Sequence, residues 1–285
     1  MDKTMKAIVF GTLTVLAAIV LIFSPRPTGA QTAKPVTERG ERINVLLLGC
    51  DESGLRTDSI MLVGADSGTG QVTMLSLPRD SKVRFNDRTR KLNSALVYGD
   101  IGLLLDTVEE LTGVPIDYYI RIKTGVFADI VDALGGVEYT VEQDMRYSDP
   151  EQDLYIDLKA GTQTLSGAQC EQYCRYRRYL MGDYTRAQKQ RELLSALVRQ
   201  KLNIGSLAKL PALYNIIKEN AETNITPADV AGHIGMLRML IGKELNIETL
   251  DTPGAYNEME IEGVSYYLVD REALQSLCQS HFRTF

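Results

Sequence analysis

The chain has 285 residues, of which 44% are hydrophobic and 24% are charged, and its formal net charge is −6 at pH 7. This length suffices for one sizeable hydrophobic core. An acidic chain without a zinc-finger or helix-turn-helix signature does not fit a nucleic-acid-binding protein. The sequence therefore predicts one compact domain with an N-terminal appendage, and no nucleic-acid partner.

An apolar segment lies close to the N-terminus. Lys3 and Lys6 precede an uncharged run over residues 7–23. As a helix this run would span roughly 26 Å, just short of a bilayer core of about 30 Å. Basic residues before the run favour a cytoplasmic N-terminus. We expect a single-pass signal anchor in the cell membrane, and cleavage near residues 28–30 is the alternative.

These features divide the chain into three parts. Residues 1–24 form the cytoplasmic stub and transmembrane anchor, and residues 25–40 form an exposed linker rich in Pro, Thr and Gly. Residues 41–285 form the extracytoplasmic domain, whose functional motifs lie within about residues 43–202.

Strands and helices alternate along this domain. Continuous apolar runs predict strands that are buried on both faces at 43–49, 59–65 and 72–77. Further strands are expected at 118–122, 137–141, 154–158, near 245–250 and near 265–269. Helices are expected at 93–111, 125–134, 166–178, 184–202, 206–220, 227–242 and from Arg271 onward. This interleaving predicts an α/β sandwich with a mixed central sheet.

Charged residues concentrate around the first three strands. If these strands are antiparallel neighbours, the first strand's end, the second's start and the third's end meet at one end of the sheet. The residues that would converge there are Asp51, Arg56, Asp58, Arg79 and Asp80. Carboxylates beside arginines suit a divalent cation bound together with a phosphate, which arginine contacts in bidentate fashion. For any single residue, an ordinary salt-bridged loop is the alternative.

A second cationic region spans residues 174–201, with eight Lys or Arg against two acids. On a helix, Asp183, Arg186 and Gln190 share one face. The same stripe continues into the apolar residues Leu193, Leu194 and Leu197. Polar groups at the head of a buried stripe should border a pocket, because burying them unpaired costs roughly 1–3 kcal/mol each. Three other arginines fall off this stripe and are interpreted as surface charge: Arg178, Arg191 and Arg199.

Arg175 and Arg177 constrain where the preceding helix ends. Two residues apart on a helix, they would point nearly opposite ways, whereas in extended backbone they share a side. Both can serve one site only if the helix ends near Cys174.

The four cysteines are interpreted as small buried hydrophobes. A disulfide between Cys50 and Cys278 is the alternative, and sequence alone does not decide between them. The absence of a CxxC motif makes a zinc site improbable.

Taken together, the motifs resemble those of the LytR-CpsA-Psr proteins, bacterial cell-wall glycopolymer ligases. The resemblance runs in family order over about residues 43–202. It rests on Asp51 with Arg56-Thr57-Asp58, Leu77-Pro78-Arg79-Asp80, Lys91-Leu92-Asn93, residues 131–137, residues 160–167, and Arg175-Tyr176-Arg177 followed by Asp183, Arg186 and Gln190.

The resemblance implies a fold and a reaction. The fold is a three-layer α/β/α sandwich whose mixed central sheet and helices enclose a hydrophobic groove for a polyprenyl chain. The donor is a polyprenyl-pyrophosphate-linked glycan, and the acceptor is a hydroxyl of peptidoglycan. The enzyme is a phosphotransferase, and polyprenyl phosphate leaves. Which polymer is transferred, teichoic acid, capsule or another, stays open.

The resemblance also implies residue roles. Asp51 and Asp58 would hold Mg²⁺ or another divalent cation such as Mn²⁺, and either could assist deprotonation of the acceptor. Besides Asp58, the catalytic residues are Arg79, Arg175 and Arg177, which would neutralise the pyrophosphate. The residues expected to bind substrate or position the arginines are Arg56, Asp80, Lys91, Asn93, Asp183, Arg186 and Gln190.

Two features of the sequence depart from the family pattern. Lys189 stands where the family often has arginine, and the loop between Asp51 and Asp58 is short. The apolar stripe of the 93–111 helix could form a wall of the lipid groove or plain core.

Two other functions are alternatives to the phosphotransferase. One is a lipid-pyrophosphate hydrolase at the same site, and the other is a non-catalytic, membrane-tethered lipid-binding or regulatory protein.

Overall fold

The computed structural model describes residues 42–50, 56–122, 125–150, 154–176, 182–201, 209–233, 236, 239–240, 246–254 and 257–285. Within these residues, no helix is long and apolar enough to cross a membrane. The predicted anchor at residues 7–23 and the linker lie outside the described residues, so both stay predictions.

A six-stranded mixed sheet forms the centre of the domain. Its strands, in spatial order, are β11 (Ala221–Thr223), β6 (Tyr118–Ile122), β1 (Arg42–Cys50), β2 (Thr57–Asp66), β3 (Gln71–Leu77) and β12 (Asn246–Asp251). β2 is antiparallel to both β1 and β3, as predicted, and β11 is antiparallel to β6. β6 and β12 run parallel to β1 and β3, respectively. β1 is buried from its second residue to its last, which confirms a strand covered on both faces.

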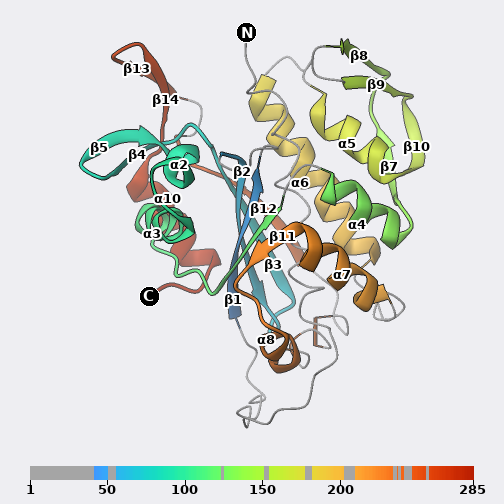
Figure 1. The fold of residues 1–285 in the computed structure, drawn as a ribbon, viewed down its shortest axis with the longest axis horizontal. Helices are drawn as coiled ribbons and strands as arrows, with labels where there is room; N and C mark the ends of the chain where they lie inside the picture. The colour runs from blue at the N-terminus through green and yellow to red at the C-terminus, as the bar shows by residue number, and fades with distance from the viewer. Residues whose placement is uncertain are drawn as a thin grey trace.

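Helices cover both faces of the sheet (Figure 1). The first face carries α4 (Val126–Leu134), α5 (Gly167–Arg175), α6 (Gly182–Lys201) and α7 (Leu210–Asn220). The second face carries α2 (Ala95–Tyr98), α3 (Ile101–Thr112) and α10 (Arg271–His281). A short α8 (Pro227–Gly232) follows β11. The predicted layering of an α/β sandwich around a mixed sheet is therefore confirmed.

Four two-stranded antiparallel sheets complete the fold. They are β4–β5 (Lys82–Phe85, Arg88–Lys91), β7–β10 (Val137–Val141, Gly161–Leu165), β8–β9 (Met145–Asp149, Leu154–Leu158) and β13–β14 (Asn257–Ile261, Val264–Leu268). The strands β6, β7 and β9 have the predicted bounds, 118–122, 137–141 and 154–158.

The single helix expected over 93–111 is instead a 3₁₀ turn (Leu92–Ser94) followed by two helices. The break lies at Gly99-Asp100, where the Asp100 carboxylate caps α3 by accepting from the Leu103 backbone N–H at 3.1 Å. Leu104 and Val108 of α3 are fully buried in the core that also contains Leu274 of α10. These side chains pack as core.

All four cysteines are buried, and none of them forms a disulfide. This confirms their interpretation as small hydrophobes and leaves no Cys50–Cys278 disulfide. Burial raises the pKa of the Cys278 thiol to about 12. Burial, assisted by the nearby charge of Asp132, raises the pKa of Cys170 to about 12 as well. Both thiols are therefore poor nucleophiles at neutral pH.

A close approach between α4 and α5 fixes the position of α5. A Cβ on Gly167 would lie 2.1 Å from the backbone oxygen of Ala128 and 2.5 Å from its Cα. The Gly167 N–H also donates to the Asp132 carboxylate at 2.8 Å. Ser166 and Gln169 add a capping box at this helix start. Because α5 ends at Arg175, this contact sets where that arginine lies.

We predict that Gly167→Ala lowers the free energy of unfolding of the full-length chain in detergent by about 1–3 kcal/mol, because the added methyl forces α4 and α5 apart. Urea denaturation measures the change. The matched control is Gly232→Ala, since a Cβ there meets nothing within 4 Å. Its effect should stay within about 0.5 kcal/mol. Equal effects of the two substitutions would contradict the close-approach explanation.

Candidate active site

An ion pair lies at the end of the sheet where β1 and β3 end and β2 begins, hereafter the site end. The Arg79 guanidinium, just after β3, donates through Nη1 to Asp58 Oδ1 at 2.5 Å. The Asp58 side chain is 4% exposed and the Arg79 side chain 17%. Antiparallel pairing of β2 with β3 brings these residues together although they are 21 positions apart.

Asp80, Lys91 and Asn93 extend this ion pair into a polar cluster. Asp80 Oδ2 lies 3.8 Å from Arg79 Nε, and Asp80 Oδ1 lies 3.2 Å from Lys91 Nζ. The Asn93 backbone N–H donates to the Arg79 carbonyl at 2.9 Å. The β4–β5 hairpin thus leaves the site end at Asp80 and returns to it at Lys91. The structure brings four of the residues expected to act at this site into direct contact with Arg79 or with its neighbour.

Arg56, Asp51 and Thr57 are the remaining residues of the motif that leads into β2. Arg56 is exposed and directly precedes β2, which keeps it at the site end of the sheet. Asp51 lies outside the described residues. Thr57, next to Asp58, is fully buried, and its hydroxyl has no hydrogen-bond partner among the residues that the structure describes.

Arg175 is the last residue of α5. The next residue, Tyr176, is extended, with φ −65° and ψ 132°. The helix therefore ends at the point that is required if Arg175 and Arg177 are to face one site. Arg177 itself lies outside the described residues. Arg175 Nη1 lies 3.5 Å from Glu171 Oε1. The Nε–H of Arg175 is buried and has no acceptor in the described part of the chain.

Glu171 occupies an environment that disfavours its charge. Burial raises the pKa of its carboxyl, although the charge of and hydrogen bond from Arg175 oppose the shift. Burial therefore makes the Glu171 carboxyl harder to ionise than an exposed one, and the buried Nε–H of Arg175 keeps hydrogen-bonding capacity for another acceptor.

The predicted stripe on α6, polar at its start and apolar below, is confirmed for the side chains that the structure describes. Gln190 is 5% exposed, and Leu193, Leu194 and Leu197 below it are buried. The Gln190 side-chain amide donates to the Cys174 carbonyl at 3.3 Å. A carbonyl in the last turn of a helix has no intrahelical donor, so this bond ties α6 to the end of α5. Asp183 and Arg186 belong to α6, but their side chains lie outside the description.

The interpretation of Arg191 as surface charge is wrong. Its side chain is 3% exposed and pairs with Asp251, the last residue of β12. Parallel pairing of β12 with β3 sets Asp251 opposite Ser76 at the site end, and no local pattern reveals this pairing. Arg199 is exposed, as predicted.

Lys189 acts as an ion-pair bridge. Its Nζ lies 2.5 Å from Glu142 and 3.0 Å from Glu192. Burial disfavours its charge, but the hydrogen bonds and charges of the two glutamates outweigh burial and raise the pKa of Lys189. The Lys189 ammonium is engaged by these two carboxylates, so we do not count it among the site residues.

Arg121 was missed by the sequence analysis. It lies in β6, where parallel pairing sets it opposite Leu48, near the end of β1. Its Nη1 donates to Glu222 at 2.6 Å, and its Nε contacts Cys50 Sγ at 3.4 Å. Burial disfavours its charge, but Cys50 and Glu222 outweigh burial and raise the pKa of Arg121. The signal available was a single charge inside an otherwise aromatic and aliphatic strand.

A layered α/β domain that holds buried arginines and carboxylates at one sheet end, with an arginine N–H left for a ligand, belongs to the class of anion-binding and phosphate-handling proteins. Comparison with known proteins gives the family. The sequence model of the LytR_cpsA_psr family matches residues 24–283. The chain belongs to this family.

Two relatives and one solved structure show how similar the chain is to known proteins. An uncharacterized protein of Staphylococcus aureus is 28% identical over 84% of this chain, which spans 61% of that relative's length. The polyisoprenyl-teichoic acid–peptidoglycan teichoic acid transferase TagU of Bacillus cereus is 30% identical over 84% of this chain and 77% of TagU. The structure of TagT bound to LI-WTA superposes with a TM-score of 0.66 and 28% identity, over 84% of this chain and 88% of that one.

We predict that Arg79→Met destabilises the full-length chain more than Asp58→Asn does. Removing Arg79 breaks a buried ion pair by taking the guanidinium from the Asp58 carboxylate, which costs roughly 3–5 kcal/mol. In Asp58→Asn the guanidinium stays partly exposed and close to Asp80, so the loss should be less than half as large. Urea denaturation at pH 7 compares the variants, and a larger loss of stability in Asp58→Asn than in Arg79→Met would contradict this explanation.

Proposed function

We propose that this chain is a phosphotransferase that moves a glycopolymer, with its linking phosphate, from a polyprenyl-pyrophosphate carrier to peptidoglycan. The relatives named TagU are transferases of this kind, with a polyisoprenyl-linked donor and peptidoglycan as acceptor. Family membership over residues 24–283 supports the same activity here.

One observation carries the proposal: Arg79 at the site end and Arg175 at the end of α5 keep hydrogen-bonding capacity for an anionic ligand. Arg79 binds Asp58 through Nη1, and Arg175 has a buried Nε–H with no acceptor among the residues that the structure describes. An unpaired buried donor on a charged group is costly, and a pyrophosphate oxygen would satisfy it.

The reaction is one displacement at phosphorus. The oxygen of an acceptor hydroxyl attacks the glycan-side phosphorus, and the bond from that phosphorus to the bridging pyrophosphate oxygen breaks. Polyprenyl phosphate leaves with the bonding electrons, and a phosphodiester joins glycan and acceptor. Asp58 or Asp51 accepts the hydroxyl proton. Arg79, Arg175 and Arg177 stabilise the negative charge that moves onto the leaving group.

The remaining residues position these groups. Asp80 and Lys91 hold Arg79 from the β4–β5 hairpin, and Gln190 holds the end of α5 through the Cys174 carbonyl. Arg56, exposed beside β2, is proposed to contact the head group. Asp183 and Arg186 are proposed to line the same head-group site from α6. Asn93 holds Arg79 through its backbone N–H.

Asp58, together with Asp51, suits Mg²⁺ or Mn²⁺. The described residues contain no cluster of three or more His, Cys, Asp or Glu side chains. Magnesium does not need one, because it takes one or two protein carboxylates and completes its shell with water and substrate phosphate. When bound, the ion would neutralise charge on the pyrophosphate.

A cationic hairpin adjoins the site and supports an anionic polymer as the transferred chain. Lys82, Arg84 and Arg88 of β4–β5 are exposed. The closest carboxylate to Arg84 is that of Asp87 at 3.9 Å, and both side chains are largely solvated, so the pair is weak. Because Lys91 of the same hairpin contacts Asp80 of the site, a polymer leaving the site meets this surface first.

The membrane part of the proposal follows from the substrate. A polyprenyl carrier resides in the bilayer, so the predicted anchor at residues 7–23 would hold the extracytoplasmic domain beside it. The apolar core between the sheet and helices α4–α7 is the proposed location of the lipid groove.

We predict that the full-length chain in detergent, given Mg²⁺, a short polyprenyl-pyrophosphate saccharide and peptidoglycan fragments, forms a phosphodiester-linked adduct that mass spectrometry detects. Arg79→Ala and Arg175→Ala should each reduce the rate roughly 100-fold or more, because each removes a donor that stabilises developing charge.

The matched control is Lys218→Ala on α7, an exposed residue, which should keep the full rate. Free saccharide phosphate without adduct would favour the hydrolase. Intact lipid bound without turnover would leave a binding protein.

We predict that Mn²⁺ binds the resting protein and that Asp58→Asn weakens this binding at least tenfold, because a neutral amide is a poor ligand for a hard cation. Electron paramagnetic resonance of free Mn²⁺ measures the affinity without any turnover. Asp106→Asn, on the exposed side of α3, is the control. Equal affinity in both variants would remove Asp58 from the metal site.

A further inference from the structure

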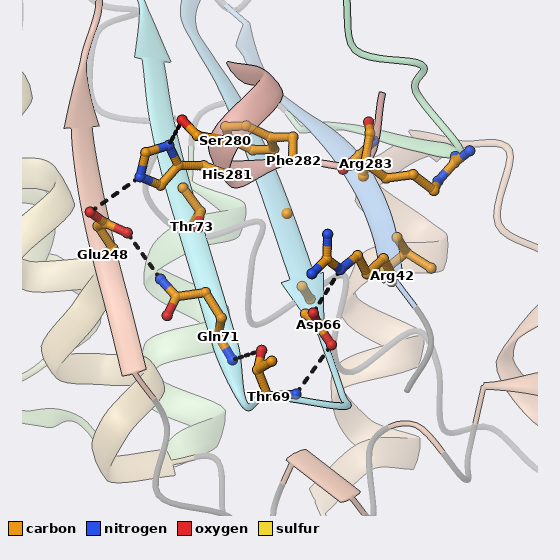
Figure 2. A pocket seen from close by; sticks show the side chains of 14 residues that line it. Arg42, Asp66, Thr69, Gln71, Thr73, Glu248, Ser280, His281, Phe282 and Arg283 are labelled. Carbon is orange, nitrogen blue, oxygen red and sulfur yellow. Dashed lines mark hydrogen bonds and ion pairs between the residues drawn. The ribbon is translucent and has the colours of Figure 1, made fainter. Parts of the chain in front are cut away.

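Two hollows of the described domain differ in what fills them. At the end of the sheet opposite the site end, a pocket of about 280 Å³ lies beside the C-terminal residues. A Cβ on Gly64 would lie 2.8 Å from the Phe282 ring, and Glu248 pairs with His281 at 3.5 Å (Figure 2). The C-terminal residues therefore cover this pocket, and its charged side chains are paired within the chain.

The second hollow is a groove of about 790 Å³ on the β8–β9 pair, hereafter the β8–β9 groove. It is lined by residues 146–148 of β8, residues 155–157 of β9 and Gln172 of α5. Its volume falls within the roughly 300–1,000 Å³ of ligand-binding sites. Four of its lining residues are exposed, so a ligand in solution can reach the groove: Arg146, Ser148, Tyr155 and Asp157.

Strand register places these four exposed side chains on one face of the β8–β9 pair. Arg146 lies opposite Asp157, and Ser148 lies opposite Tyr155. The other face is buried in the first-face core and carries Met145, Leu154, Ile156 and Leu158. The pair is therefore held by its apolar face, and it presents a face with one aromatic ring among polar groups to solvent.

Tyr155 offers an uncovered aromatic ring. It is 58% exposed, and its side chain has no ring, cation or hydrogen-bond partner among the residues that the structure describes. Tyr98 is exposed as well, but the Arg90 guanidinium lies 3.5 Å from its ring centroid. The face of an aromatic ring carries negative charge density, which attracts the C–H groups on one face of a pyranose ring. Tyr155 is therefore a platform on which a sugar ring can stack.

The polar groups beside Tyr155 keep hydrogen-bonding capacity and carry no net charge. Gln172 Oε1 accepts from the Asp157 backbone N–H at 3.4 Å, and its Nε2 has no acceptor in the described part of the chain. Arg146 and Asp157 form a 3.4 Å ion pair whose side chains are largely solvated, so the pair is weak and both groups can bind hydroxyls. Because these two charges cancel, the groove does not favour a polyanion.

The β8–β9 groove adjoins the phosphotransfer site through α5. Gln172 of the groove and Arg175 of the site are three positions apart on this helix, so their Cβ atoms are neighbours, about 5–6 Å apart. The β8–β9 pair lies at the same end of the domain as the start of β2 (Figure 1). A chain molecule bound in the groove can therefore extend to Arg175.

We propose that the β8–β9 groove binds the acceptor glycan as a neutral run of N-acetylated pyranose rings. One ring stacks on Tyr155, an N-acetyl carbonyl accepts from Gln172 Nε2, and hydroxyls bind Asp157 and Arg146. The inference rests on the proposed function, because it locates the acceptor of that reaction. It also separates the two glycans by charge, since the cationic β4–β5 hairpin suits an anionic donor polymer and the β8–β9 groove suits a neutral acceptor.

The first test measures binding of chitotetraose, a neutral chain of N-acetylated rings, to the full-length chain in detergent by saturation-transfer NMR. Tyr155→Ala should weaken binding roughly tenfold or more, because it removes the stacking ring, and Tyr155→Phe should bind like wild type. Tyr98→Ala is the matched control, an exposed tyrosine outside the groove, and should keep full binding. Failure of wild type to bind, or equal binding by Tyr155→Ala, overturns the proposal.

The exposure of Tyr155 makes Tyr155→Ala a safe substitution for the fold, so its melting temperature should match that of wild type. If it melts lower, Tyr155→Thr, which keeps strand propensity, takes its place in the binding test. Displacement of chitotetraose by short-chain polyphosphate would assign the groove to an anionic polymer and overturn the proposal.

Two further measurements separate the β8–β9 groove from the Arg79 site. Arg79→Ala should bind chitotetraose like wild type, and loss of binding would place the sugar at Arg79 and overturn the proposal. In the transfer reaction, Tyr155→Ala should raise the KM for peptidoglycan fragments roughly tenfold and leave kcat unchanged, whereas a fall in kcat alone overturns the acceptor role. If wild type binds chitotetraose but transfers nothing, the proposed function fails, and the groove is a sugar site without an acceptor role.

Discussion

Antiparallel pairing of β1, β2 and β3 is the constraint from which the site follows. These strands are covered by helices on both faces, so a shift of one residue in register would exchange the side chains of the two cores. With the register fixed, the end of β3 must lie beside the start of β2. Arg79 and Asp58 therefore meet at 2.5 Å, and the polar cluster with Asp80 and Lys91 is built around them.

The helical layer on the first face is fastened to this end by contacts that also position cations. Gly167 allows α5 to approach α4 at backbone distance, and the side-chain amide of Gln190 in α6 donates to the Cys174 carbonyl near the end of α5. Arg191 anchors the same helix to Asp251 at the end of β12. These contacts account for part of the basic excess over residues 174–201 in an acidic protein. Some of the charges hold the layers together, and others keep capacity for a ligand.

Much of the fold was predictable because the patterns were local. Apolar runs and flanking turns located β1, β2, β3 and β6, and connectivity alone predicted that Asp58 and Arg79 share one end of the sheet. The β4–β5 hairpin was missed because Arg88–Lys91 carries three charges and no apolar alternation. The burial of Arg191 was missed for another reason. It depends on β12 pairing parallel to β3, between residues 175 positions apart, and no local window of sequence contains that information.

At the end of the sheet opposite the site end, Asn44 fastens the C-terminus to the sheet. Its backbone N–H donates to Asp117, and its amide nitrogen binds the carbonyls of Pro115 and Arg283. One side chain thereby joins β1, the segment before β6 and the C-terminus. Those bonds use only the donor half of the amide. The acceptor half is buried where the Phe282 ring covers Gly64, because a Cβ on Gly64 would lie 2.8 Å from Phe282 Cδ1 and 3.7 Å from Asn44 Oδ1. Asn44 therefore joins the three segments through its donors alone, and the C-terminal Phe282 takes the space above Gly64 that a larger residue would fill.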